Sequence, residues 1–230
     1  MPTKVRHEPI APAALPSTRQ RRKEARPQEL LDAALELFGE KGFAATRTDD
    51  VAERAGVSKG TLYLYYPSKE ELLKAVISQR LSSEIAAAAE ITEHYEGSTA
   101  QLMTEVLSDW WIKVYDSPTS AVFKLVITEV RNFPEIAQFY IHEVVEPAHR
   151  LLGQAIALGV AQGEFRDVNL EDAVHSLVLP LIMLCLHRHS LGACAADWRL
   201  DPARFIGAHV NLVLDGLIQP ARAVEAPSAR

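Results

Sequence analysis

A cluster of cationic side chains near the start of the chain could bind a polyanion. It consists of Arg19, Arg21, Arg22, Lys23 and Arg26, and residues 1–26 hold seven Lys and Arg against two Asp and Glu. The first 80 residues carry a net charge of +3 and the remaining 150 carry −9, which gives −6 for the whole chain. Such asymmetry hints at nucleic-acid binding, although most basic runs are only solvated surface. On charge alone, a polyanion-binding end and a solvated tail both stay open.

Two histidines and two cysteines are the other residues whose types suggest chemistry. His187 and His189 lie two positions apart, which on a helix separates them by about 200° and keeps them from sharing one metal ion. Cys185 and Cys194 stand nine positions apart in an apolar stretch, where cysteines are mostly small buried side chains. We therefore expect no metal site, no redox site and no disulfide, in a reduced, cytoplasmic protein.

Motifs that would predict catalysis are missing from the sequence. It has no Gly-rich phosphate loop, no H-E-x-x-H and no G-x-S-x-G. We expect neither enzymatic activity nor a cofactor.

The hydrophobic pattern predicts an all-α protein. No stretch shows sustained strand alternation, and apolar residues recur at three- and four-residue spacing from Pro27, which suits a first helical turn. No apolar run reaches the roughly 18 residues of a membrane span, the longest being Ser176–Leu186. After a helix from Pro27 to Gly42 and two short helices, the expected long helices span 69–94, 99–115, 119–131, 135–162, 170–189 and 202–218.

Residues 48–65 have the pattern of a helix-turn-helix. Thr48 is expected to cap the first short helix, because its hydroxyl can accept a hydrogen bond from a free backbone N–H. Gly56 supplies the tight turn. Ser58 caps a second short helix, which ends before Pro67. Two short helices joined in this way are typical of DNA-binding domains. Two classes therefore stay open, a ligand-responsive DNA-binding regulator and an architectural DNA binder without a ligand. A thermal-shift screen distinguishes them, because a cognate ligand stabilises a sensor.

The stretch Pro27–Leu73 resembles the N-terminal domain of the TetR/AcrR family of bacterial repressors. The matching string is Thr48-x-x-x-Val51-Ala52-x-x-Ala55-Gly56-Val57-Ser58-x-Gly60-Thr61-Leu62-Tyr63-x-x-Tyr66-Pro67-Ser68-Lys69-Glu70-x-Leu72. The resemblance covers roughly a fifth of the chain. It implies an N-terminal three-helix helix-turn-helix domain at 23–68 and a larger α-helical ligand-binding and dimerisation domain at 69–220. We expect a disordered basic tail at 1–22 and a disordered tail at 221–230.

The resemblance also implies roles for single residues. Thr48 and Lys69 should contact phosphates, the N-terminal end of the recognition helix should enter the major groove, and Tyr63 should face the DNA. Arg47 could contact a phosphate or remain a free surface charge, and Leu64 stands where an aromatic residue is more usual. Leu62 and Tyr66 are expected in the core. The expected DNA-binding set is Arg47, Thr48, Ser58, Lys59, Gly60, Thr61, Tyr63, Tyr65 and Lys69.

A repressor of this family needs an input, and aromatic and sulfur side chains in the middle helices are candidates for a pocket. They are Met103, Trp110, Trp111, Phe123, Phe139 and Tyr140, with Met183 further on. The segment Phe133–Ile136 is similar to AcrR-like C-terminal domains, which favours a hydrophobic or amphipathic small-molecule inducer. The apolar helices near 170–189 and 202–218 are either a homodimer interface or an ordinary core pair. We expect a palindromic DNA operator as the partner and no membrane.

Overall fold

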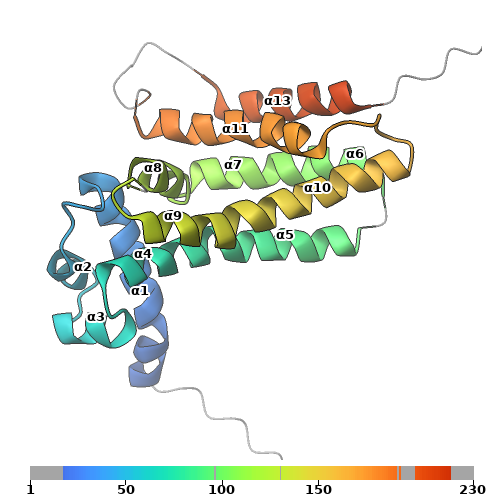
Figure 1. Ribbon diagram of the computed structural model, residues 1–230. Coiled ribbons are helices and arrows are strands. Elements are labelled where there is room, and N and C mark those ends of the chain that lie inside the picture. Colours follow the sequence, from blue (N-terminus) through green and yellow to red (C-terminus); the bar gives the residue numbers. More distant parts are fainter. Residues whose placement is uncertain (1–17, 96, 130, 191, 193–199, 219–230) are drawn as a thin grey trace, which may run out of the picture.

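The computed structural model describes residues 18–95, 97–129, 131–190, 192 and 200–218, and these form an α-helical molecule (Figure 1). Three helices at one end, α1 (Thr18–Lys41), α2 (Thr48–Arg54) and α3 (Lys59–Tyr65), stand beside a bundle of longer helices. The all-α expectation is confirmed. The expectations for residues 1–17 and 221–230 and for Cys194 lie outside the described residues.

Helix α1 begins earlier than the sequence analysis predicted. It starts at Thr18, so Pro27 lies inside the helix and not in its first turn. Residues 18–22 are therefore helical and not part of a tail. Residues 18–26 are mostly Arg, Lys, Gln, Glu and Ala, which favour the helix. Their helix propensity outweighs the single backbone hydrogen bond that Pro27 cannot make.

The long helices follow the predicted ranges, but three of them contain a π-helical turn. Such turns are rare and occur mostly as single interruptions of α-helices. The interrupted helices are α4 (Lys69–Ile77), η1 (Ser78–Ser82) and α5 (Ser83–Glu93); α6 (Thr99–Leu102), η2 (Met103–Leu107) and α7 (Ser108–Asp116); and α9 (Pro134–Tyr140), η3 (Ile141–Val145) and α10 (Glu146–Ala161).

The remaining helices are regular and complete the bundle. They are α8 (Ser120–Glu129), α11 (Leu170–Arg188) and α13 (Pro202–Leu217). Helices α11 and α13 lie side by side at the top of Figure 1, and they pack on α7, α8 and α10. Helices α11 and α13 begin at the residues predicted from the sequence, 170 and 202. The side chains of Asn169 and Asp201 cap their first turns.

Helix α11 needs separate mention, because it is long and apolar. It has 19 residues, and an 18-residue window of it has a mean hydropathy of 1.4, so that by length and composition it could cross a membrane. A core helix of a soluble protein meets the same criterion. Leu177 and Leu181 are fully buried inside the bundle, which identifies one face of α11 as core.

A continuous core joins the three-helix end to the bundle. Leu30 and Ala34 of α1 are fully buried, and α1 packs on α4 and α8. Phe43, just after α1, meets Phe133 edge to face at 4.8 Å between ring centroids. Gly42 permits this approach, because its φ of 81° is a left-handed conformation that other residues avoid. The short helices are thus anchored on the bundle.

Candidate DNA-binding surface and ligand cavity

The helix-turn-helix is held by the contacts that its sequence predicted. Gly56 has a φ of 66°, which closes the turn between α2 and α3. The Ser58 hydroxyl accepts a hydrogen bond from the backbone N–H of Thr61 at 3.1 Å, so it caps α3. Leu62 is fully buried and fixes the inner face of α3. Lys59 and Gly60, at the N-terminal end of this helix, remain exposed.

Thr48 has a different role from the expected helix cap. Arg47 is the N-cap residue of α2 and makes no side-chain capping bond. The Thr48 hydroxyl instead lies 2.9 Å from the Tyr63 hydroxyl. This bond joins the start of α2 to α3, and Tyr63 keeps 41% of its surface exposed. The prediction that Thr48 caps α2 was wrong, because its hydroxyl bonds to Tyr63 of α3 and not to a backbone N–H of α2.

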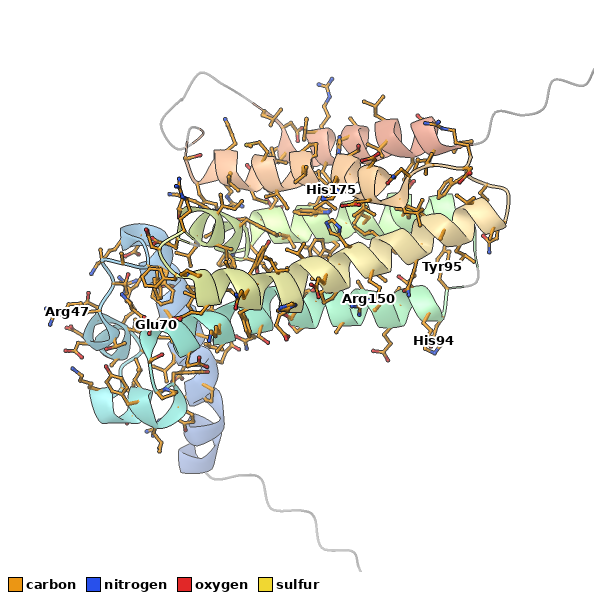
Figure 2. The ribbon with its side chains drawn as sticks, in the orientation of Figure 1. Arg47, Glu70, His94, Tyr95, Arg150 and His175 are labelled. Carbon is orange, nitrogen blue, oxygen red and sulfur yellow. The ribbon has the colours of Figure 1, made fainter. Side chains whose placement is uncertain are left out.

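Two cations stand at the exposed end of the molecule. Arg47 is exposed and projects outward from the short helices (Figure 2). Lys59 pairs with Asp49 at 2.7 Å, and that hydrogen-bonded carboxylate raises the pKa of the Lys59 ammonium. Both groups are exposed, so the pair is held weakly and the ammonium can turn to another anion.

Lys69 differs most from its expected role as a phosphate contact. Its ammonium donates to the carbonyls of Phe43, Ala44 and Thr46 at 2.8, 3.2 and 3.1 Å. The same nitrogen lies 4.5 Å from the centroid of the Phe43 ring. An ammonium has three N–H donors, and all three are used here. Lys69 therefore fixes the loop between α1 and α2, and no donor is left for a phosphate.

The other aromatic side chains of α3 differ in exposure. Tyr65 and Tyr66 are half-buried and pack against the core. Burial raises the pKa of the Tyr66 hydroxyl. Leu64, by contrast, is 79% exposed. The predicted core position of Leu62 is confirmed, and that of Tyr66 holds in part.

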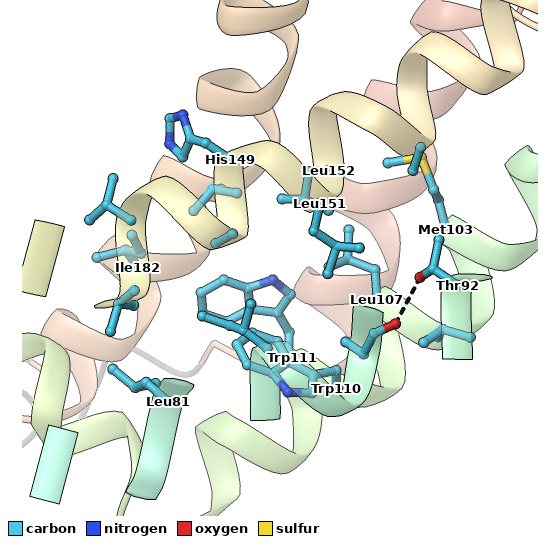
Figure 3. A pocket seen from close by; sticks show the side chains of 18 of the residues that line it. Leu81, Thr92, Met103, Leu107, Trp110, Trp111, His149, Leu151, Leu152 and Ile182 are labelled. Carbon is cyan, nitrogen blue, oxygen red and sulfur yellow. Dashed lines mark hydrogen bonds between the residues drawn. The ribbon is translucent and has the colours of Figure 1, made fainter. Parts of the chain in front are cut away.

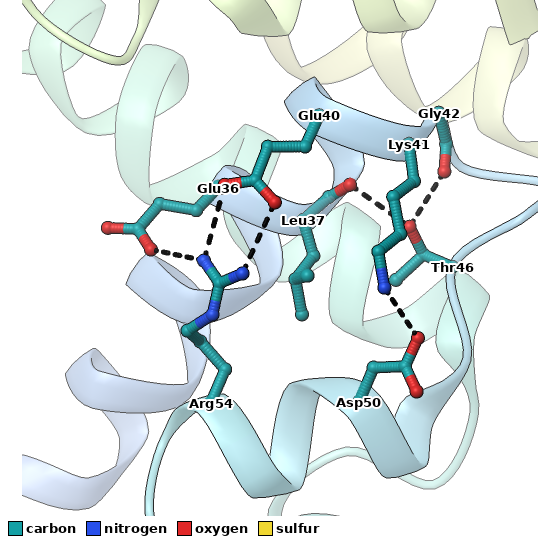
Figure 4. A network of polar contacts seen from close by, with 8 residues as sticks. All are labelled: Glu36, Leu37, Glu40, Lys41, Gly42, Thr46, Asp50 and Arg54. Atoms are coloured by element: carbon teal, nitrogen blue, oxygen red, sulfur yellow. Dashed lines mark hydrogen bonds and ion pairs between the residues drawn. The ribbon is translucent and has the colours of Figure 1, made fainter.

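An ion-pair network that the sequence analysis missed holds α2 on α1 (Figure 4). Arg54 of α2 donates to Glu36 at 3.0 Å and to Glu40 at 3.2 Å on α1. Lys41 pairs with Asp50 at 3.0 Å. The hydrogen bond from Arg54 lowers the pKa of Glu40, and that from Lys41 lowers the pKa of Asp50. The partners lie 9 to 18 positions apart, so no local spacing could reveal them.

A cavity of about 140 Å³ lies inside the bundle, between α5, α7, α10 and α11 (Figure 3). Five of the seven residues predicted to form a pocket line it, namely Met103, Trp110, Trp111, Phe123 and Tyr140. The other two do not. Phe139 packs elsewhere, with the Lys74 ammonium 5.9 Å from its ring centroid, and Met183 is 62% exposed on the outer face of α11. One helical position turns a side chain by about 100°, which is why Tyr140 and Phe139 face different ways.

The cavity wall is apolar and carries few polar atoms. The indole nitrogens of Trp110 and Trp111 are buried without a hydrogen-bond partner. Burial raises the pKa of the Tyr140 hydroxyl to about 12. Burial, and then the neighbouring His175, lowers the pKa of His149, so this imidazole is neutral at pH 7. The described residues that line the cavity thus include no Asp, Glu, Lys or Arg.

All three π-helical turns contribute to this wall. Leu81 comes from η1, Met103 and Leu107 from η2, and Val144 from η3. No sequence pattern indicated these turns. Their shared position on one cavity links an unusual backbone to a candidate binding site.

A wider groove of about 670 Å³ adjoins the cavity on the side of α4, α5 and α10. Ile85 and Leu151 line both spaces. The groove is more polar, with Gln79, Ser82 and Arg150 in its wall. Arg150 is exposed and its position on α10 is visible in Figure 2. The two spaces together form an apolar chamber beside a polar surface.

Apolar residues also remain exposed on the paired helices α11 and α13. The residues named from the sequence, such as Leu177, Leu181 and Val210, are buried within the chain. Leu179 and Leu212 are instead 55% and 73% exposed. Together with Met183, one turn after Leu179, they leave an apolar outer face on this side of the bundle.

Comparison with known proteins identifies a family with this architecture. Residues 30–76 match the family model for bacterial regulatory proteins of the tetR family. The HTH-type transcriptional regulator YfiR of Bacillus subtilis (strain 168) is 30% identical over 158 residues, which are 66% of this chain and 74% of YfiR. The chain belongs to the TetR family. It is a DNA-binding transcriptional regulator with an N-terminal helix-turn-helix.

Two further similarities cover most of this TetR-family chain. The HTH-type transcriptional repressor KstR2 of Rhodococcus jostii (strain RHA1) is 28% identical over 200 residues, 86% of this chain and 94% of KstR2. The structure of FadR from Bacillus subtilis in complex with stearoyl-CoA superposes with a TM-score of 0.67 at 18% identity, covering 83% of this chain and 98% of FadR. These relatives are transcription regulators, a class distinct from enzymes.

Proposed function

We propose that this chain is a ligand-responsive repressor, released from its operator when a small hydrophobic or amphipathic molecule enters the cavity. One observation carries the proposal. The continuous helix from Lys69 to Glu93 touches both sites. Its first residue holds the loop before α2, and its Leu81, Ile85 and Ala88 line the cavity. A ligand that prefers one position of this helix changes the placement of α3.

The DNA-binding surface follows from exposure and position at the end of the molecule. Lys59, Gly60 and Thr61 at the start of α3 would enter the major groove, and the helix N-terminus would favour a phosphate. Arg47 and Tyr63 are exposed beside them. Contacts to DNA are therefore assigned to Arg47, Thr48, Ser58, Lys59, Gly60, Thr61, Tyr63 and Tyr65. Lys69 is assigned the positioning of the loop 43–46.

A homodimer through α11 and α13 would cover the exposed apolar face and present two recognition helices to a palindromic operator. Leu212 is the most exposed large apolar residue on these two helices, at 73%. Leu212→Glu should convert a dimer to a monomer in sedimentation experiments and lower operator affinity at least tenfold. The control is Leu158→Glu, at an exposed position on α10. A dimer that survives Leu212→Glu would contradict this interface.

The domain division follows from the same assignments. Residues 23–68 would act as the DNA-binding unit and 69–220 as the ligand-binding and dimerisation unit, in the cytoplasm. FadR was crystallised with stearoyl-CoA, an amphipathic ligand, and this supports an amphipathic or hydrophobic inducer here. The apolar cavity wall supports the same class.

Operator binding by the purified protein is the test. Labelled DNA from upstream of its own gene is titrated across a salt series, with a scrambled fragment of equal length as the control. We expect tight, salt-dependent binding that prefers the native fragment. Tyr63→Ala should weaken it about tenfold, whereas Tyr95→Ala, at the opposite end of the bundle (Figure 2), should not. No preference for native sites, even after genome-wide site selection, would refute sequence-specific regulation.

A further inference from the structure

The outer face of helix α3 carries an apolar side chain. Leu64 is 79% exposed, more than any other large apolar residue that the structure describes. Leu62 is fully buried, and two positions on a helix turn a side chain by about 200°. Leu64 therefore lies on the side of α3 that faces away from the core. A single exposed leucine needs no explanation by itself, and its neighbours on α3 decide whether it has a role.

Gly60 stands one turn before Leu64, on the same outer face of α3. Glycine stabilises a helix less than alanine does. Its φ is not among the positive angles of the described glycines, and a Cβ built on it would meet only the Ser58 Oγ, at 3.9 Å. Nothing in the described part of the chain therefore requires glycine here. The remaining use of a bare backbone is the close approach of another molecule.

Gly60 and Leu64 together form one apolar surface, the Gly60–Leu64 face. Helical side chains lean towards the N-terminus of their helix, so that Leu64 covers the turn that contains Gly60. The Tyr63 hydroxyl lies 2.9 Å from the Thr48 hydroxyl, which directs Tyr63 towards α2 and away from this face. The face thus offers an isobutyl group beside bare backbone, and neither side chain can form a hydrogen bond.

An apolar face on a DNA-binding helix suits one group in the major groove. A leucine side chain cannot hydrogen-bond to a phosphate or to a base edge. The apolar group that base pairs present in the major groove is the C5-methyl of thymine. We propose that Leu64 reads the methyl group of one thymine in each operator half-site, and that Gly60 lets the base edge come close. The inference rests on the proposed function, because it names a base that the recognition helix reads.

Replacing thymine with deoxyuridine tests the contact, since it removes the methyl group and keeps the base pair. Each thymine in one half-site of the operator is replaced in turn, and the affinity of the full chain is measured. Wild-type protein should lose about fourfold at one thymine, which is the effect of one buried methyl group. Leu64→Ala should lose less than 1.5-fold at that position. Losses that are the same in both proteins at every position, or no loss in wild type at any thymine, would overturn the inference.

Methylated cytosine gives the reverse test at the same position. A cytosine–guanine pair replaces the thymine–adenine pair, and the cytosine is then supplied with a C5-methyl group. The methyl group should raise the affinity of wild-type protein about fourfold and leave that of Leu64→Ala unchanged. Leu158→Ala, at an exposed leucine on α10, is the matched control and should respond like wild type. An equal response of Leu64→Ala and wild type would contradict the contact.

Gly60→Ala tests the close approach. Alanine is the better helix former and its Cβ has space within the chain, so Tm should stay the same or rise. The added methyl group would stand between α3 and the base edge, and we expect operator affinity to fall at least fivefold. Affinity within twofold of wild type would refute the close approach at Gly60.

Failure of this inference can be distinguished from failure of the proposed function. Protein that prefers its operator to scrambled DNA, without a methyl effect that depends on Leu64, refutes the thymine contact and leaves regulation standing. Protein that prefers no DNA sequence refutes both, because it then reads no base. The salt slope is a further readout, since an apolar base contact releases no counterions and Leu64→Ala should keep the wild-type slope.

Discussion

Replacing Lys69 with methionine removes the ammonium that holds the loop 43–46 and keeps an apolar side chain in its place. The hydrogen bonds to the carbonyls of Phe43 and Thr46 are partly buried and contribute roughly 1 kcal/mol each, whereas the exposed bond to Ala44 contributes little. The contact with the Phe43 ring at 4.5 Å adds about 0.5–1 kcal/mol. We therefore expect Lys69→Met to lower the free energy of unfolding by about 2–3 kcal/mol.

Two assays distinguish the role of Lys69 in holding the loop 43–46 from a contact with a DNA phosphate. Urea unfolding at fixed protein concentration gives the loss of stability. Operator binding across a salt series, under conditions where both proteins are folded, gives the slope of log affinity against log salt. A lost phosphate contact reduces the steepness of that slope by about 0.9, and we expect Lys69→Met to leave it unchanged.

Arg47→Met is the matched control, because Arg47 is an exposed cation at the same end of the molecule. It should change the free energy of unfolding by less than about 0.5 kcal/mol and reduce the salt slope by about 0.9. If Lys69→Met behaved like Arg47→Met, with full stability and a shallower slope, the reasoning from the three carbonyl contacts would be refuted.

Three further predictions concern other contacts. Tyr63→Phe removes the hydroxyl bonded to Thr48 and should lower operator affinity about fivefold in polarisation assays, with stability nearly unchanged; wild-type affinity would contradict this role. Gly159→Ala brings a Cβ within 2.3 Å of the Phe165 ring and should cost about 1–3 kcal/mol in thermal melts, unless the ring moves freely and Tm stays the same. The pKa of His149 is lowered in the folded state, so the unfolded chain binds a proton first as pH falls. The free energy of unfolding should therefore drop as pH falls through the ordinary histidine pKa of about 6.5, and should drop less in His149→Gln. Parallel curves for the two proteins would show that His149 is not responsible.

The sequence predicted those parts of the fold that depend on local chemistry. Proline, glycine and capping residues mark helix ends by backbone geometry alone, so the breaks before α9, α11 and α13 were readable. The helix-turn-helix was readable for the same reason, because Gly56 and Ser58 act within a few residues of themselves.

Contacts between distant segments could not be predicted in this way. Arg54 meets acids 14 and 18 positions away, and Lys69 meets carbonyls 23 to 26 positions away. Apolar side chains at helical spacing indicate a buried face but not which neighbour covers it. Phe139 was therefore indistinguishable from Tyr140 until the packing of α9 was known.

The π-helical turns have a consequence for how the chain tolerates insertions and deletions. A π turn closes its hydrogen bond over five residues where an α turn uses four, so each contains one residue beyond the regular count. Deleting one residue from Ser78–Ser82 restores an α-helix and keeps Lys69 in phase with Ile85. The same deletion elsewhere in this helix rotates one end against the other by about 100°. A one-residue deletion in any of the three π-helical turns should therefore leave the side chains on both sides of it on the same helix faces.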